Sequence, residues 1–342
     1  MLEPEIAAFV ARTAAIYPAH AASLAPREQR AIYDRYAAAF TPRLPEGVAT
    51  QDAAFRARAG HSIKLRLYRN RAKAHDAASG VVLYFHGGGF VLGSLDSHQI
   101  VTARIAADTG LDVIAVDYRL APEHRAPAAH DDCLEIALAA LQGRLPFDSP
   151  TRCALRLAGD SAGGNLAASV AMRLRDDGVE GVRGLALIYP MLGIEPQMPA
   201  RETEAHAPML TLADVHAFRD LYWGGEQSPY PTWTIPLDAT RIDGLPPTLA
   251  IGCEHDPLRD DARVFAERID SAGGEARYWL GAGLVHGCWR AMDSSPGVQA
   301  LHHEVCRFCV PALSADPLKN NRRVNALHAC RPIATRPQSP TE

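Results

Sequence analysis

Five short apolar runs alternate with helical segments along the middle of the chain, and this alternation limits the fold more than any other feature. The runs begin at residues 81, 113, 154, 185 and 248, and most are rich in Val, Ile and Leu. The helical segments between several of them lie at about 98–109, 127–141, 163–176 and 257–272. Strands that are apolar along their length are typical of a parallel sheet covered by helices on both faces. The sequence therefore predicts an α/β fold with a mostly parallel central sheet, whose ligand site lies at the carboxyl ends of the strands.

The segments on either side of this core have other patterns. Residues 52–58 and 63–69 alternate apolar and polar side chains, which is typical of half-exposed antiparallel strands. Residues 1–45 are rich in Ala and predict helices. Residues 190–240 interrupt the alternation with seven prolines and several aromatic residues, and we interpret them as an insertion over the site rather than a separate domain.

The length of 342 residues suits one large α/β domain with an insertion. We expect this single domain to span residues 1–311. From Pro311 onward the composition shifts to Pro, Arg, Asn and Ser, which predicts a disordered tail over residues 312–342.

Charge and composition exclude several classes of function. The net charge of −4 provides no electrostatic footprint for nucleic acid. No apolar run reaches the ~20 residues that a membrane span needs. Glu3 and Glu5 stand where a secretory signal needs positive charge, so we expect the N-terminal segment to stay in the mature protein. The seven cysteines have no framework spacing, which favours reduced thiols and a cytoplasmic location.

The strongest local signal is Gly159-Asp-Ser-Ala-Gly163, which fits the pattern G-x-S-x-G between a predicted strand and a predicted helix. A nucleophile on so tight a turn takes a strained backbone conformation, and the flanking residues approach each other closely. Only glycine fits easily at the flanking positions. We interpret Ser161 as a candidate nucleophile whose turn also directs the N–H of Ala162 into the site.

A second signal is His86-Gly-Gly-Gly-Phe90, directly after the first apolar run. A glycine run exposes backbone N–H groups, and such donors stabilise the oxyanion formed when a carbonyl carbon is attacked, by ~3 kcal/mol each. The alternative is a loop that binds the phosphates of a nucleotide. The glycines do not fit G-x-G-x-x-G, and no Lys-Ser or Lys-Thr pair follows, so we favour the oxyanion interpretation.

Two candidate partners for Ser161 come later in the chain. Their order, with the acid before the histidine, is the one found in proteins that contain this turn motif. Asp256 follows the run that begins at residue 248, and His286 follows the predicted strand 275–280. Both therefore belong at the carboxyl ends of strands, at the same edge as Ser161.

Neighbouring acids and bases are weaker candidates. Asp260 and Asp261 fall in the helix that Pro257 starts, and we interpret them as charges at its N-terminus. His255 is expected to point away from the site, because neighbours alternate sides in an extended segment.

Five motifs follow one another in the chain: His86-Gly-Gly-Gly-Phe, Asp117-Tyr-Arg-Leu-Ala-Pro-Glu123, Gly159-Asp-Ser-Ala-Gly-Gly-Asn165, Asp256-Pro-Leu-Arg-Asp260 and His286-Gly287. Through them the chain resembles the hormone-sensitive-lipase family of esterases in its bacterial form, over roughly residues 40–310. Two departures are that Cys288 stands between His-Gly and the aromatic Trp289, and that the tail beyond Pro311 has no family counterpart.

The resemblance implies an α/β-hydrolase fold with a mainly helical cap from about 1–45 and 190–240. It implies hydrolysis of short- to medium-chain acyl esters without a cofactor, so the expected partner is a small-molecule ester. The residues that it assigns are the triad Ser161, Asp256 and His286 and the oxyanion-hole amides of Gly88, Gly89 and Ala162.

Three aromatic residues near the cap, Phe90, Tyr222 and Trp223, are candidates for the substrate pocket, with ordinary packing of the cap as the alternative. Cys306-x-x-Cys309, with His302 and His303 nearby, invites a metal interpretation. A zinc site normally needs a second pair of ligands, so we expect no metal and a packing role for this helix.

Two other classes of function stay open. One is a non-catalytic binding protein on the same fold, like the plant gibberellin receptors, which lack the catalytic histidine; the presence of His286 argues against it. The other is an amidase or acyltransferase with the same triad. The natural substrate does not follow from the sequence, and neither does the oligomeric state, for which a homo-oligomer is one outcome.

Overall fold

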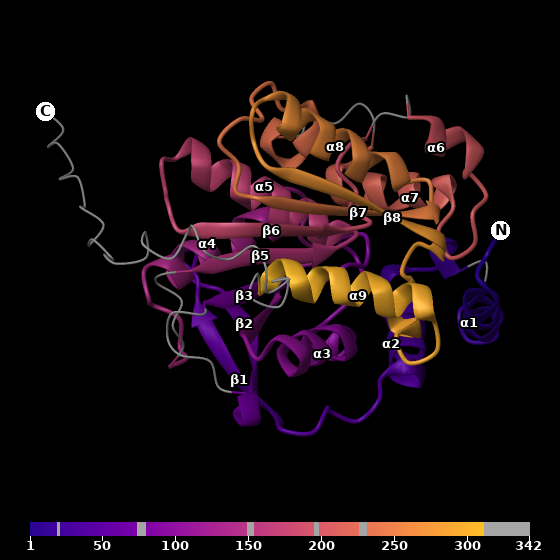
Figure 1. The fold of residues 1–342 in the computed structure, drawn as a ribbon, viewed down its shortest axis with the longest axis horizontal. Helices are drawn as coiled ribbons and strands as arrows, with labels where there is room; N and C mark the ends of the chain where they lie inside the picture. The colour runs from indigo at the N-terminus through magenta and orange to yellow at the C-terminus, as the bar shows by residue number, and fades with distance from the viewer. Residues whose placement is uncertain (19–20, 74–79, 149–153, 195–197, 226–230, 311–342) are drawn as a thin grey trace, which may run out of the picture.

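The structure is a computed structural model that describes residues 1–310 except 19–20, 74–79, 149–153, 195–197 and 226–230. The predicted tail over residues 312–342 lies outside the described residues. In the described part of the chain, one sheet of eight strands forms the centre of the molecule (Figure 1). Its order is β1-β2-β4-β3-β5-β6-β7-β8. The strands are β1 (Val48–Arg56), β2 (Ser62–Asn70), β3 (Val81–Phe85), β4 (Asp112–Asp117), β5 (Leu155–Asp160), β6 (Val182–Ile188), β7 (Thr248–His255) and β8 (Ala276–Val285).

The strand directions follow the sequence pattern. The apolar strands from β4 across to β8 pair in parallel, whereas the alternating strands β1 and β2 pair antiparallel with each other, and β2 is antiparallel to β4. The predicted α/β fold with a mostly parallel sheet is confirmed. β1 begins four residues before the predicted segment, because Val48 already pairs with Asn70 of β2.

Helices cover both faces of the sheet, which explains why the central strands are apolar throughout. Along β3, Leu83 and Phe85 pack toward α4, α5 and α8, while Val82 and Tyr84 pack toward α3 and α9. Figure 1 shows α9 and α3 lying across the near face of the sheet. These helices are α3 (Gln99–Thr109), α4 (Ala128–Leu141), α5 (Ala162–Asp176), α8 (Arg259–Ser271) and α9 (Pro296–Cys309).

Four further helices gather near one end of the sheet (Figure 1). They are α1 (Pro4–Ala14), α2 (Pro26–Phe40), α6 (Pro199–Thr203) and α7 (Leu212–Trp223). They come from the two segments expected to form a cap, residues 1–45 and 190–240. The short 3₁₀ turns are η1 (Ala21–Ser23), η2 (Arg71–Lys73), η3 (Thr232–Thr234), η4 (Pro236–Asp238) and η5 (Cys288–Ala291). Among the described residues, every helix is too short or too polar to cross a lipid bilayer.

Candidate active site

Ser161 occupies the turn between β5 and α5, with a backbone φ of +54° and ψ of −118°. This conformation costs a non-glycine residue on the order of 1–3 kcal/mol. The surroundings leave no alternative to glycine on either side. A Cβ at Gly163 would overlap the carbonyl oxygen of Phe85, and a Cβ at Gly159 would overlap the carbonyl oxygen of Gly163. The turn is thus held tightly against β3, and its strain lifts the Ser161 side chain above the end of the sheet.

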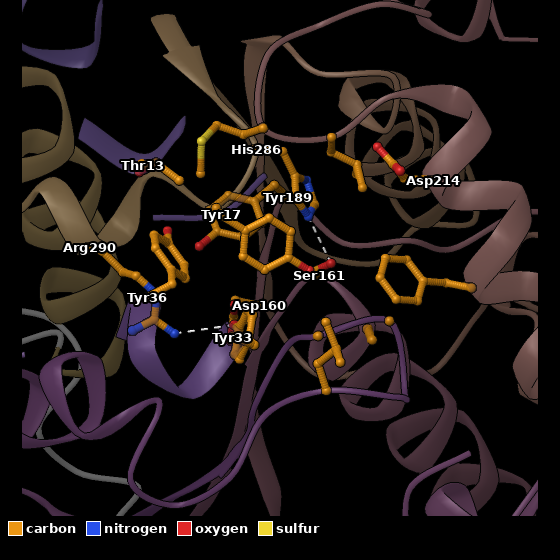
Figure 2. Close-up of a pocket in the computed structure, with 18 of the residues that line it drawn as sticks. Thr13, Tyr17, Tyr33, Tyr36, Asp160, Ser161, Tyr189, Asp214, His286 and Arg290 are labelled. Atoms are coloured by element: carbon orange, nitrogen blue, oxygen red, sulfur yellow. Dashed lines mark hydrogen bonds between the residues drawn. The ribbon is translucent and has the colours of Figure 1, made fainter. Parts of the chain in front are cut away.

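The structure brings the three predicted triad residues together at this edge. Oγ of Ser161 lies 2.8 Å from Nε2 of His286 (Figure 2). On the other side of the ring, Nδ1 of His286 lies 2.8 Å from Oδ2 of Asp256. Asp256 directly follows β7 and His286 directly follows β8, which are parallel neighbours. The three side chains therefore meet because β5, β7 and β8 run parallel in one sheet and end at the same edge.

The carboxylate of Asp256 is completely buried and held at two points. Its Oδ2 faces the His286 ring, and its Oδ1 accepts a hydrogen bond of 2.8 Å from the N–H of Leu258. A buried carboxylate fixed in this way holds the imidazole so that Nε2 faces the hydroxyl. The Tyr189 ring packs beside the imidazole, with ring centroids 4.9 Å apart.

The glycine run after β3 borders the same cavity. Gly88 and Gly89, with φ of +119° and +60°, line it together with Ala162, the first residue of α5. A Cβ at Gly88 would overlap the carbonyl oxygen of Leu92, and a Cβ at Gly89 would overlap the ring of Phe218. The three amides predicted for the oxyanion hole therefore belong to residues beside Ser161, and the glycines permit a backbone path that other residues cannot follow.

Asp160, to which the sequence alone assigns no role, ties the glycine run to the Ser161 turn. Its Oδ1 accepts hydrogen bonds from the N–H of Gly87 and the hydroxyl of Tyr84, and its Oδ2 lies 3.5 Å from Nε2 of His98. Burial raises the pKa of Asp160, but His98 and the Tyr84 hydroxyl outweigh it and lower the pKa to about 2. The sequence does show an acidic residue between an apolar strand and Ser161. A carboxylate buried at such a position needs hydrogen-bond or ion-pair partners.

A cavity of about 420 Å³ opens at Ser161. One side is formed by the N-terminal segment, from which Thr13, Tyr17, Tyr33 and Tyr36 face the cavity (Figure 2). The opposite side is formed by α7 and the residues before it, among them Leu210, Val215 and Phe218. Both segments predicted to form a cap therefore supply walls of the cavity.

The predicted substrate-pocket residues Phe90, Tyr222 and Trp223 do not line this cavity, and that prediction is corrected. All three are buried and pack on one another, with ring centroids of Phe90 and Tyr222 4.1 Å apart. The Tyr222 hydroxyl bonds Nδ1 of His130 at 2.6 Å. The alternative of ordinary packing is therefore the one that the structure shows.

The structure also places the weaker candidates His255, Asp260 and Asp261, and Cys288. His255 lies 3.3 Å from a carboxylate oxygen of Glu204 and is absent from the cavity wall. Asp260 and Asp261 sit in the first turn of α8, where Asp261 pairs with the buried Arg201 at 2.9 Å. Cys288 is buried, with its Sγ 3.9 Å from Sγ of Cys253.

Comparisons with known proteins identify a family and several similar esterases. The model of a family described by the α/β-hydrolase fold matches residues 82–290. The esterase LipI of Mycobacterium tuberculosis is 37% identical over 66% of this chain and 70% of its own length. Ethyl acetate hydrolase of Pseudomonas putida is 30% identical over 83% of this chain and 91% of its own length. The solved ester hydrolase EH1AB1, from the metagenome of Lake Arreo, matches with a TM-score of 0.83 at 30% identity, covering 92% of this chain and 100% of that chain.

Proposed function

Because this chain belongs to the α/β-hydrolase fold family, and to its hormone-sensitive-lipase-like esterase branch, we propose that it hydrolyses carboxylic esters with short- to medium-chain acyl groups. The observation that carries the proposal is the alignment of Ser161, His286 and Asp256, with both joining distances at 2.8 Å. Similarity to LipI and to ethyl acetate hydrolase supports ester chemistry.

In the proposed mechanism, Oγ of Ser161 attacks the acyl carbon while Nε2 of His286 takes the hydroxyl proton. Asp256 holds the imidazole in the required tautomer and stabilises the imidazolium that forms. The backbone N–H groups of Gly88, Gly89 and Ala162 stabilise the oxyanion. His286 then protonates the departing alcohol. Water repeats the sequence on the acyl-enzyme and releases the carboxylic acid.

The size and walls of the cavity support a compact ester. Its volume of about 420 Å³ lies toward the lower end of the ~300–1,000 Å³ typical of small-molecule sites. Leu210, Val215 and Phe218 on one side and the tyrosines of the N-terminal segment on the other enclose Ser161. We propose that residues 1–45 and 190–240 act together as the cap that sets the accepted chain length.

The proposal is tested with a series of 4-nitrophenyl esters of increasing acyl length, assayed on the full chain and on Ser161→Ala. We expect turnover with an optimum at short to medium chains, and its loss in Ser161→Ala with an unchanged far-ultraviolet circular dichroism spectrum. Matched anilides in place of the esters separate an esterase from an amidase, and added alcohol acceptors separate it from an acyltransferase. A folded protein without turnover of any of these esters would support the non-catalytic binding protein instead.

The proposed location and assembly rest on sequence alone. The cytoplasmic location is inferred from cysteine usage, and the homo-oligomer stays a prediction. Sedimentation of the purified chain measures the second directly.

A further inference from the structure

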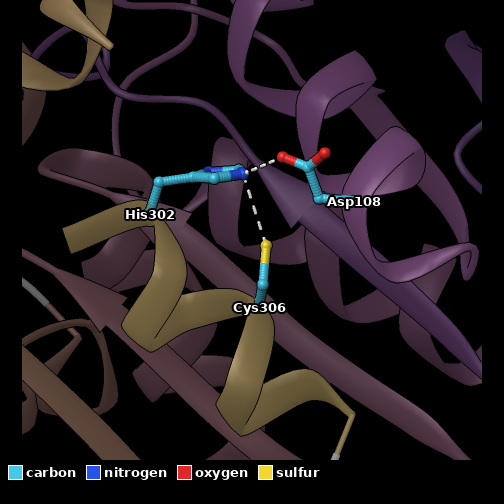
Figure 3. Close-up of side chains that lie close together, drawn as sticks. All are labelled: Asp108, His302 and Cys306. Atoms are coloured by element: carbon cyan, nitrogen blue, oxygen red, sulfur yellow. Dashed lines mark hydrogen bonds and ion pairs between the residues drawn. The ribbon is translucent and has the colours of Figure 1, made fainter. Parts of the chain in front are cut away.

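Three side chains with metal-ligating atoms converge where α3 meets α9. His302 and Cys306 are four residues apart on one face of α9, and Asp108 is the penultimate residue of α3 (Figure 3). Nε2 of His302 lies 2.8 Å from Oδ2 of Asp108 and 3.3 Å from Sγ of Cys306. One ligand atom from each residue lies within 4.8 Å of the other two.

The arrangement differs in one decisive way from that at Ser161. There the carboxylate contacts Nδ1 of the histidine and the hydroxyl contacts Nε2, as a proton relay requires. At His302 the carboxylate and the sulfur both approach the same atom, Nε2. In this arrangement no carboxylate of the described residues contacts Nδ1 of His302. The ring is therefore not oriented to remove the proton of the Cys306 thiol, as His286 is for the Ser161 hydroxyl. Three donor atoms that point at one small volume instead suit a single ion.

We propose that Asp108, His302 and Cys306 bind a divalent transition-metal ion of the zinc type. Imidazole nitrogen, thiolate and carboxylate are the donors that zinc takes in proteins, at ~2.0–2.3 Å. At tetrahedral angles these bond lengths separate nitrogen from sulfur and from oxygen by roughly 3.4–3.6 Å. The observed separations of 3.3 and 2.8 Å are shorter by roughly 0.3 and 0.6 Å, so the side chains must move apart to admit the ion.

A neighbouring cavity gives the ion access and leaves room for a water molecule as the fourth ligand. A cavity of about 320 Å³ lies beside the cluster and is lined also by Asp293 and His303. The Asp108 side chain is 45% exposed, whereas His302 and Cys306 are buried. Water entering from the cavity completes a site of three protein ligands.

Binding is a balanced exchange. The ion replaces the thiol proton of Cys306, which leaves to solvent. The proton that Nε2 of His302 donates to the Asp108 carboxylate is transferred to Nδ1, so the ring stays neutral while Nε2 becomes a ligand. Thiolate and carboxylate together neutralise the charge of the ion. Because protons compete for the same atoms, affinity falls as pH falls.

The ion links α3 and α9, two helices that are distant in the sequence. α9 is the last described helix and packs on the same sheet face as α3. The His302 ring also packs against Trp289, three residues after His286, with ring centroids 6.1 Å apart. We therefore expect the ion to stabilise the fold, with little effect on ester turnover.

The test uses the full chain without a histidine tag, freed of metal with a chelator and titrated with Co²⁺. Cobalt bound by a thiolate has a sulfur-to-metal charge-transfer band in the near ultraviolet. We expect this band at one equivalent in the wild type. It should persist in His303→Gln, which changes a histidine of the same cavity, and in Cys309→Ala, which changes another cysteine of α9. It should vanish in Cys306→Ala and weaken at least tenfold in apparent affinity in His302→Gln and Asp108→Asn.

Thermal unfolding with Zn²⁺ is the second measurement. Excess Zn²⁺ should raise the melting temperature of the wild type and His303→Gln, raise that of His302→Gln less, and leave that of Cys306→Ala unchanged, each compared with its own metal-free form. A wild type without the charge-transfer band or the thermal shift, or a Cys306→Ala variant that keeps both, overturns the proposal. Esterase assays on metal-free protein keep this result separate from the proposed function.

Discussion

Asp160 accepts a hydrogen bond of 3.0 Å from the backbone N–H of Gly87, so the residue before Ser161 anchors the start of the glycine run. The same carboxylate oxygen accepts the Tyr84 hydroxyl. The two loops that the proposed mechanism needs are thus joined below the cavity by one buried side chain.

Asp160→Ala should therefore disturb catalysis by releasing the start of the glycine run. The Gly87 N–H and the Tyr84 hydroxyl lose their buried acceptor, which costs on the order of 1–3 kcal/mol each. We expect a lower melting temperature and a fall in kcat of roughly 10–100-fold from misplaced oxyanion donors, with a smaller change in KM. Steady-state kinetics on folded protein checks this, and an unchanged kcat would show that the anchor is dispensable.

Gly163→Ala tests the close approach of the Ser161 turn to β3. The added Cβ would overlap the Phe85 carbonyl oxygen, which is backbone and cannot rotate away. We expect loss of turnover together with destabilisation of several kcal/mol, measured by urea unfolding. Gly178→Ala is the control, since no heavy atom lies within 4 Å of its Cβ position, and should cost only the ~1 kcal/mol of its left-handed backbone. Equal effects of the two changes would contradict the packing shown here.

Phe218→Ala should lengthen the preferred acyl chain. The Phe218 ring lines the cavity at Ser161, so its removal opens space on the α7 side. Tyr222→Phe, one turn later on the same helix, should leave the preference unchanged, because that ring packs on Phe90 away from the cavity. The rate series over acyl lengths measures both variants. A shift in Tyr222→Phe and none in Phe218→Ala would restore the sequence-based assignment.

Acid should destabilise the fold through buried histidines. Burial lowers the pKa of His86 and His130 from 6.5 to about 3. The unfolded chain takes up these protons near pH 6.5, whereas the folded protein keeps both rings neutral down to about pH 3. The free energy of unfolding should therefore fall with decreasing pH in this window, by about 1.4 kcal/mol per pH unit for each ring.

Urea unfolding at pH 7 and pH 5 measures this slope. His130→Gln should make it shallower by one proton, whereas the exposed His303→Gln should leave it unchanged. A slope that is the same in all three proteins would show that His130 does not titrate on unfolding.

The sequence predicts which strand ends carry the candidate residues. Ser161 and Asp256 follow apolar runs, His286 follows the predicted strand 275–280, and in the structure each directly follows a strand of the parallel part of the sheet. The sequence does not predict how a helix is placed. Nothing local to α7 says that Phe218 faces the cavity while Tyr222 faces Phe90.

The cluster at α3 and α9 shows a related limit. The helical spacing of His302 and Cys306 is visible in the sequence, but the third donor is distant along the chain. Asp108 lies beside them only because two helices pack against the same face of the sheet. A search of the sequence for a second pair of neighbouring ligands therefore does not find the site.

The most direct test of the central claim is covalent labelling by an organophosphate, followed by peptide mass spectrometry. The account predicts one adduct per chain, on Ser161, with a labelling rate that falls by roughly 10³-fold or more in His286→Ala, because the hydroxyl then lacks its base. An adduct on another residue, or a His286→Ala variant labelled as fast as the wild type, would contradict it.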